Sequence, residues 1–125
     1  MRRWKVFNRA ERKPHERQPL DPAVFAELQA ATGADFAAEL AATFLEEAPG
    51  MIAELKQAAA AGDSNSFRRA AHSLKSNANT FGASALAELA RQMELSGLSG
   101  PVPDLAALDA EHIRAGAALR ELLDG

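Results

Sequence analysis

The chain has 125 residues and no cysteine, so we expect one domain of ordinary size without disulfides, thiolate nucleophiles or cysteine-based zinc sites. Its formal net charge of −3 is unevenly spread, because residues 1–17 carry +5 and the remainder carries −8. The acidic charge of the body argues against nucleic-acid binding through the fold. No segment reaches the roughly 18 apolar residues that a membrane span needs. The lack of cysteine is consistent with a location in the cytoplasm.

The composition predicts an all-α protein. Alanine, the best helix former, is heavily used, whereas the aromatic residues that favour strands are limited to six phenylalanines and one tryptophan. Residues 1–19 are interpreted as a basic tail or linker, because Pro14 and Pro19 break any helix there. The alternative is a docking segment for another domain or for a membrane surface, and Trp4, Val6 and Phe7 could anchor a short helix onto the body.

Helix signals begin just after this tail. Asp21-Pro22 is typical of a helix cap followed by proline at the first helical position, and this short helix should end near Thr32, before Gly33. A longer helical stretch is predicted over Ala34–Ala61. Within it, Pro49-Gly50 should produce either a kink or a clean break.

The next two helices are separated by glycine. Gly62 should end the long stretch, and Asp63 should cap a helix that runs from about Ser64 to Phe81. Gly82 then allows a tight passage into another helix, over about Ser84–Ser96.

A glycine- and proline-rich loop over residues 97–103 precedes the last predicted helix, about Asp104–Leu123. Within that helix Gly116 suggests a close approach to a neighbour, since glycine costs roughly 1 kcal/mol against alanine in a helix. Four long amphipathic helices with short loops favour an antiparallel up-down four-helix bundle, with the short first helix capping one end. We therefore expect one all-α domain over residues 20–125, complete as a monomer.

The predicted helix over about Ser64–Phe81 has two unlike faces. Its apolar residues recur at three- and four-residue steps and form one stripe: Phe67, Ala70, Ala71, Leu74, Ala78 and Phe81. Its polar residues are neighbours one turn apart on the other side: Arg68, Arg69, His72, Lys75, Ser76 and Asn79. His72 is therefore expected on a solvent-facing ridge, with cationic side chains before and after it.

Three interpretations of His72 fit the sequence poorly. A core histidine is disfavoured because apolar residues already fill the stripe that faces inward. A metal ligand would need a second donor three or four positions on, where Lys75 would repel a cation. A general base in an enzyme would need a nucleophile, oxyanion site or cofactor loop, and the chain has no glycine-rich phosphate loop or nucleophile elbow.

Two interpretations remain open from the residues alone. His72 could be a nucleophile that holds a phosphoryl group, with Lys75 supplying a nearby positive charge and Glu94 on the facing helix fixing the ring tautomer. Arg68 and Arg69 would strengthen the positive field. Alternatively, the residues form an ordinary solvated helix face. His112 lacks such a cationic setting, and we do not expect it to be the phosphorylated site.

The string Ala71-His72-Ser73-Leu74-Lys75-Ser76, followed by Ala78-Asn79 and Gly82-Ala83, resembles the signature of histidine-containing phosphotransfer (HPt) domains. The resemblance covers about residues 20–97. It implies a four-helix bundle in which His72 accepts a phosphoryl group from the aspartate of one receiver domain and passes it to another. It also implies that Lys75 contacts the phosphoryl group and that Glu94 bonds the histidine ring.

The resemblance carries further expectations about partners and cofactors. The partners would be receiver domains of hybrid histidine kinases and of response regulators, and Mg²⁺ would belong to the receiver rather than to this chain. Without a nucleotide-binding motif the chain should be a carrier and not an enzyme. Many family members have glycine where this chain has Ser76, and that difference could narrow the choice of receiver.

Two rivals to a phosphate carrier remain at this point. The first is a helical scaffold or adaptor bundle that carries no phosphate. The second is the dimerisation hairpin of a kinase, which needs two chains to complete its bundle, whereas this chain has enough helices alone.

Overall fold

The computed structural model describes residues 18–100 and 103–124, and within these ranges the chain is helical, without strands. The helices are α2 Pro22–Thr32, α3 Ala34–Ala61, α4 Ser64–Thr80, α5 Ser84–Ser96 and α6 Leu105–Asp124. The expectations for residues 1–17, including a contact through Trp4 or Phe7, lie outside the described residues.

Aspartate side chains begin three of these helices, because they accept hydrogen bonds from backbone N–H groups that have no helical partner. Asp21 accepts from Ala23 N at 3.0 Å, and Asp63 accepts from Ser66 N at 3.1 Å. Asp104 accepts from Ala107 N at 2.9 Å in the same way. The hydrogen bonds from Ser66 also lower the pKa of Asp63. These caps explain why short-range sequence signals located the helix starts so closely.

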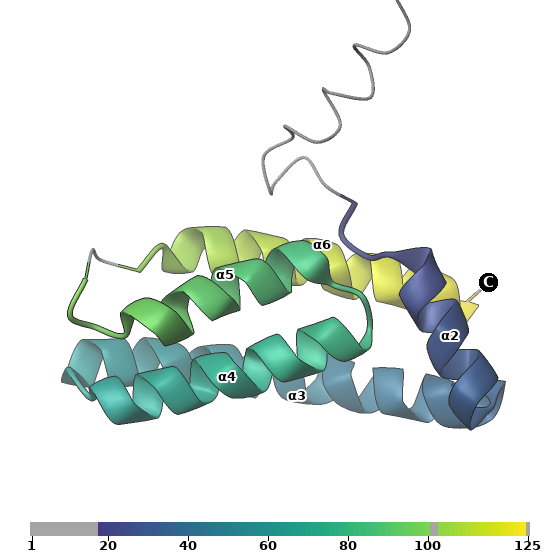
Figure 1. Cartoon of the computed structure of the whole chain (residues 1–125), viewed down its shortest axis with the longest axis horizontal. Helices are drawn as coiled ribbons and strands as arrows, with labels where there is room; N and C mark the ends of the chain where they lie inside the picture. Colours follow the sequence, from purple (N-terminus) through teal and green to yellow (C-terminus); the bar gives the residue numbers. More distant parts are fainter. Residues whose placement is uncertain (1–17, 101–102, 125) are drawn as a thin grey trace, which may run out of the picture.

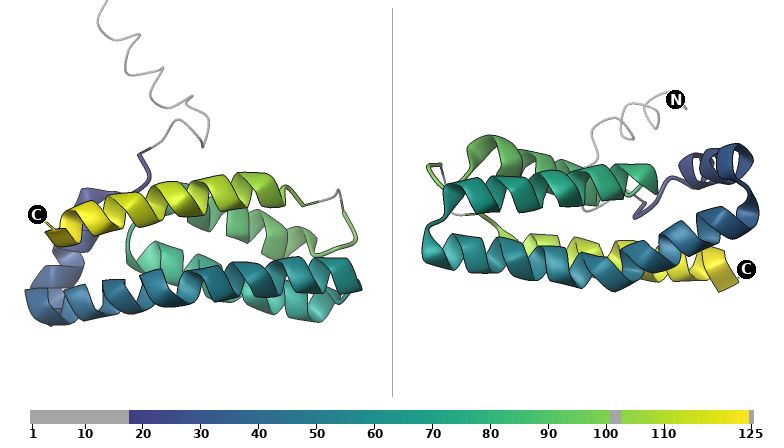
Figure 2. Two further views of the ribbon diagram at one scale, coloured as in Figure 1. Left: turned by 180° about the vertical axis from the view of Figure 1, so that it is seen from behind. Right: turned by 90° about the horizontal axis from the view of Figure 1, so that it is seen from below.

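Helices α3 to α6 form an antiparallel up-down bundle (Figure 1). Each packs on its sequence neighbour, and the ring closes because α6 also packs on α3. Figure 2 shows α3 and α6 on one side of the bundle, with α4 and α5 on the other. Helix α2 lies across one end and contacts α3 and α4. The predicted bundle with a short extra helix is therefore confirmed.

Small side chains dominate the core. Twelve of the 24 buried hydrophobic residues in the described chain are alanines. The largest fully buried side chains fill the space between them: Phe67, Leu55, Leu74, Leu86, Leu108 and Leu119. Phe44 and Phe81 make a tilted ring contact, with centroids 5.2 Å apart, near the end that α2 covers. Alanine at so many contact positions lets the helices approach closely.

One detail of the helices differs from the sequence expectation. Helix α3 continues through Pro49, so a clean break at Pro49-Gly50 is wrong, and both residues are exposed. Phe36 and Ile113 lie on the predicted helices but are 50% and 66% exposed. Single exposed apolar residues are normal on soluble proteins, and here they fall outside the inward faces.

Gly116 is buried in α6 opposite Leu45 of α3, but a close approach does not require glycine there. An added Cβ would lie 3.6 Å from Leu45 Cδ2, which is ordinary van der Waals contact. We expect Gly116→Ala to stabilise the protein by about 0.5–1 kcal/mol, because alanine restricts the unfolded chain and favours the helix. Urea unfolding of both proteins checks this, and a destabilised variant would show that α3 and α6 cannot admit a methyl group.

The corner between α4 and α5 sets how these two helices face each other. Gly82 adopts a left-handed conformation with φ of 75°, and its carbonyl accepts hydrogen bonds from Ser84 N and from Asp21 N, both at 2.9 Å. The second bond ties the start of α2 to this corner. As a result α5 folds back along α4, and residues near the middle of α4 meet residues near the end of α5.

Candidate functional site

His72 lies in the middle of α4 on its outer face. The residues on either side of it in the helical stripe, Ala71 and Leu74, are fully buried, and the imidazole itself is 58% exposed. An amphipathic helix whose apolar stripe is already filled leaves this position to solvent. The predicted ridge is therefore present, with His72 accessible at its centre.

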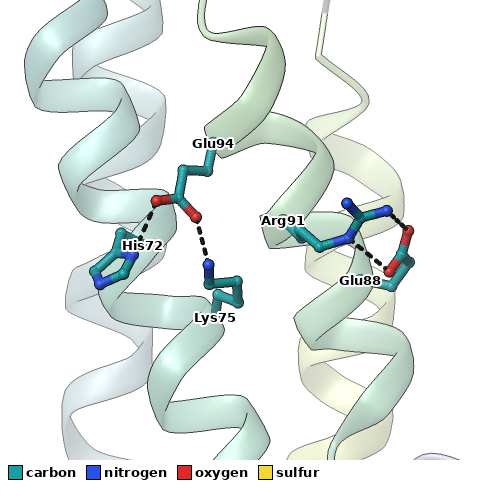
Figure 3. A network of polar contacts seen from close by, with 5 residues as sticks. All are labelled: His72, Lys75, Glu88, Arg91 and Glu94. Carbon is teal, nitrogen blue, oxygen red and sulfur yellow. Dashed lines mark hydrogen bonds and ion pairs between the residues drawn. The ribbon is translucent and has the colours of Figure 1, made fainter.

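Glu94 of α5 binds both His72 and Lys75 of α4 through separate oxygens (Figure 3). Its Oε2 lies 2.8 Å from His72 Nδ1, and its Oε1 lies 2.7 Å from Lys75 Nζ. The two α4 residues are three apart and face α5 together, so one carboxylate can reach both. The structure thus brings together the three residues that the sequence singled out from two helices.

The carboxylate determines which ring nitrogen carries the proton. Hydrogen bonds lower the pKa of Glu94, first the one from Lys75 and then the one from His72, so at neutral pH its oxygens only accept. Nδ1 of His72 must therefore donate, and in the neutral ring Nε2 keeps its lone pair. In Figure 3 Nε2 points away from Glu94.

This pairing gives the site a defined pH dependence. The folded-state pKa of Glu94 is lower than its ordinary value of 4.5. Its contribution to stability is therefore complete above the ordinary value, and it is lost as the pH falls through the lowered pKa.

Arg68 and Arg69 diverge from each other, and neither joins the group at Glu94. The guanidinium of Arg68 covers Gly97 at the end of α5, where a Cβ would lie only 2.5 Å from its Nε. A cation there is favourable because a helix C-terminus carries partial negative charge. Arg69 turns toward α3 and donates to Ser66 Oγ at 3.4 Å. One turn from His72, the two arginines thus flank it on opposite sides.

The remaining predicted residues shape the surface and the corner. Ser76 and Asn79 are exposed on α4, and their backbone carbonyls accept hydrogen bonds from Thr80 Oγ1 and Gly82 N. Because these side chains are short, they project little from the surface of α4 beyond His72. Gly82 is buried at the corner, two to three turns from His72, so its place in the structure is architectural.

Features that the sequence did not single out flank His72 on both sides. On α5, Arg91 donates two hydrogen bonds to Glu88, as Figure 3 shows, and Leu95 is 67% exposed. Arg91 lies three positions before Glu94, and this spacing would have placed it beside Glu94 on α5. Between α3 and α4 lies a groove of about 430 Å³ lined by Glu54, Gln57, Ala58, Ala61, Asp63, Ser66, Arg69 and Ser73. It joins two helices, so no single-helix pattern predicts it.

Other candidate chemistry is not assembled in the described residues. His112 is half-buried on α6, and burial is the main cause that lowers its pKa, with Asp109 opposing. In the described ranges no group of three histidine or carboxylate side chains could hold a metal. None of the described helices is long and apolar enough to cross a bilayer.

Comparison with known proteins identifies the family. The model of the Hpt domain matches residues 39–124. The chain belongs to the Hpt family. A crystal structure of histidine-containing phosphotransfer protein B (HptB) from Pseudomonas aeruginosa PAO1 is similar, with 31% sequence identity and a TM-score of 0.70, over 85% of this chain and 91% of that one. Comparison with curated proteins returned no match.

Membership of the Hpt family makes this chain a histidine phosphotransfer carrier of phosphorelays. Hpt proteins are phosphocarriers and not kinases, and their partners are the receiver domains of two-component systems. The matched residues contain α4, α5 and α6 entirely and most of α3, so the whole bundle apart from its first turns belongs to the Hpt domain.

Proposed function

We propose that His72 is the residue that carries the phosphoryl group, accepting it from the aspartate of one receiver domain and giving it to the aspartate of another. The observation that carries this proposal is the ring geometry. Nδ1 is bonded to Glu94 at 2.8 Å, which leaves Nε2 as the exposed nucleophile on a half-exposed imidazole.

The charge of α4 supports a receiver as the partner. This helix has three cationic residues and no acidic one, whereas each of the other described helices has more acidic than basic residues. A receiver presents an acidic pocket with its phosphorylated aspartate and, in this proposal, the Mg²⁺ that the reaction needs. A cationic surface attracts such a partner and speeds its association.

The experiment is incubation with a phosphorylated receiver domain. We expect the chain to become labelled with radioactive phosphate. This label should be stable in base and lost in acid, which is the behaviour of a phosphohistidine. A helical scaffold that carries no phosphate would take up none. Profiling against all receivers of the source organism would identify donors and acceptors.

We propose that the carrier acts as a monomer, because α3–α6 complete the bundle within one chain.

Lys75 has a specific place in this proposal, as a group that stabilises the transferred phosphoryl charge. We expect Lys75→Ala to slow phosphotransfer roughly tenfold or more, since a hydrogen bond to a charged group contributes about 1.5–3 kcal/mol. Stability should fall by at most about 1 kcal/mol, because the ion pair with Glu94 lies near the surface. Single-turnover transfer rates and melting temperatures check both parts.

A second lysine provides the matched control. Lys56 makes an ion pair of the same length, 2.7 Å, with Asp109, and it links α3 to α6 away from His72. Lys56→Ala should cost a similar amount of stability and leave the transfer rate unchanged. Equal rates for the wild type and Lys75→Ala would contradict the assigned role of Lys75.

A further inference from the structure

A groove lies between the segment that leads into α2 and the last turns of α6. Its volume is about 380 Å³, and five of its seven lining residues are apolar. The lining residues are Gln18, Pro19, Leu20 and Pro22 on one side and Ala118, Glu121 and Leu122 on the other. Leu122 is 38% exposed, so part of the apolar lining is still open to water. An apolar occupant would gain free energy by covering it.

The rim of this groove is acidic. Glu121 and Asp124 lie in the last turn of α6, which contains no basic residue, and no ion pair within the described ranges involves either of them. A helix C-terminus carries partial negative charge, so carboxylates there favour the approach of a cation. Arg120 does not supply it, because its guanidinium turns back along α6 to within 3.6 Å of a Cβ placed on Gly116. On the other side of the groove, the carboxylate of Asp21 caps α2.

Residues 1–17 carry the side chains that would complement this groove. Seven of them are lysine or arginine and two are glutamate, whereas the rest of the chain is acidic. They also contain the only tryptophan, Trp4, which Lys5 separates from further apolar residues that include Phe7. An indole combines a large apolar face with an N–H group that can donate to a carboxylate such as that of Glu121.

We propose that residues 1–17 dock on their own domain, with Trp4 in the groove between the start of α2 and the end of α6. The cationic side chains of this segment lie at Glu121 and Asp124. Gln18 lines the groove, so the segment leaves from its rim, and the 13 residues between Trp4 and Gln18 are enough to turn back onto it. A tether of this kind gives an effective concentration on the order of millimolar, which favours the chain's own segment over a separate partner.

The docked segment leaves the phosphotransfer face open. The groove lies at the end of the bundle that α2 crosses (Figure 1), whereas His72 lies in the middle of α4. Ten residues separate His72 from the corner at Gly82, which is about 15 Å along a helix. The inference is therefore independent of the proposed function, and releasing the segment should leave transfer from a receiver unchanged.

The first test uses the fluorescence of Trp4. The chain has one tryptophan and no tyrosine, so tryptophan emission reports on this residue alone. In the wild type we expect emission at shorter wavelength, and weaker quenching by acrylamide, than in the urea-unfolded chain. Leu122→Glu puts a charge into the groove, and it should move both quantities toward the values found in urea. A wild type whose emission and quenching equal those of the unfolded chain would overturn the proposal.

Ile113 provides the matched control for Leu122. It lies on the same helix, is 66% exposed and does not line the groove. Ile113→Glu should therefore leave the emission of Trp4 as it is in the wild type. Equal emission changes in the two variants, or a change in neither, would show that the groove is not the docking site. Circular dichroism should give the same helicity for both, because both positions are exposed and glutamate is a good helix former.

The second test addresses the charges at the rim. Glu121→Lys should increase quenching of Trp4, and sodium chloride should act in the same direction on the wild type, because exposed charges are screened by salt. Glu47→Lys makes the same change of charge on α3, at an exposed position outside the groove, and should have no effect. Equal quenching in Glu121→Lys and Glu47→Lys would overturn the role of the acidic rim.

Two further measurements distinguish the other occupants. Docking within one chain does not depend on protein concentration, so the protection of Trp4 should persist on dilution. Protection that disappears on dilution would assign the groove to a second copy of the chain and overturn the proposal. Protection that appears only when phosphatidylglycerol vesicles are added would assign the segment to an anionic membrane and overturn it as well.

Discussion

Replacing His72 by glutamine should reduce phosphoryl labelling of the chain to background while the bundle stays folded. The amide has no nitrogen lone pair able to attack phosphorus, so the loss is of the nucleophile itself and not of a helper. The imidazole is 58% exposed and makes its side-chain contact with Glu94 at the surface. Stability should therefore change by no more than about 0.5 kcal/mol. Transfer from a phosphorylated receiver and thermal unfolding measure the two effects.

His112 offers a matched control for this substitution. It is half-buried on α6, its pKa is lowered mainly by burial, and it is not paired with Lys75 or Glu94. His112→Gln should therefore retain full labelling. Acid-labile phosphate persisting on the His72→Gln protein would place the carrier residue elsewhere in the chain.

Replacing Gly82 by alanine should give the largest loss of stability among single methyl additions, about 1–3 kcal/mol or more. A Cβ there would lie 2.9 Å from Asp21 O and 2.9 Å from Val24 Cβ, closer than real contacts allow. The backbone conformation, with φ of 75°, adds strain for any residue with a side chain. The clash falls on the contact that fixes the start of α2 against the α4–α5 corner.

Gly50 is the control for Gly82. It lies inside α3 with nothing within 4 Å of an added Cβ, and its φ is not positive. Gly50→Ala should stabilise the protein by about 0.5–1 kcal/mol, since helical alanine is preferred to glycine. Urea titrations of the two variants should thus move in opposite directions. A Gly82→Ala protein as stable as the wild type would mean that the corner can open without cost.

The sequence predicted most of the helix boundaries because these depend on neighbouring residues. Asp21-Pro22, Gly62-Asp63 and Gly82 carry their cap and turn chemistry within a few positions, and the structure places helix ends at each. The amphipathic pattern of α4 likewise placed His72 outside the core. The faces of the two predicted antiparallel helices were sufficient to suggest that Glu94 could contact His72.

What the sequence could not predict depends on the neighbour that each side chain finds. Arg68 and Arg69 differ by one position, or about 100° around the helix. Because of that difference, Arg68 covers the backbone of Gly97, whereas Arg69 points toward Ser66 and the groove between α3 and α4. The contact that Lys75 makes in the structure is with Glu94 of α5. Such choices follow from packing between helices and not from a pattern along one.

The alanine-rich core has a consequence for how stability varies with temperature. Alanine has no side-chain rotamers to lose on burial, so the entropic cost of ordering this core is low. It also covers little apolar surface, so unfolding exposes less of it and the heat-capacity change per residue should be small. A small heat-capacity change flattens the dependence of unfolding free energy on temperature. The bundle that presents His72 should therefore keep nearly constant stability across a broad range of growth temperatures.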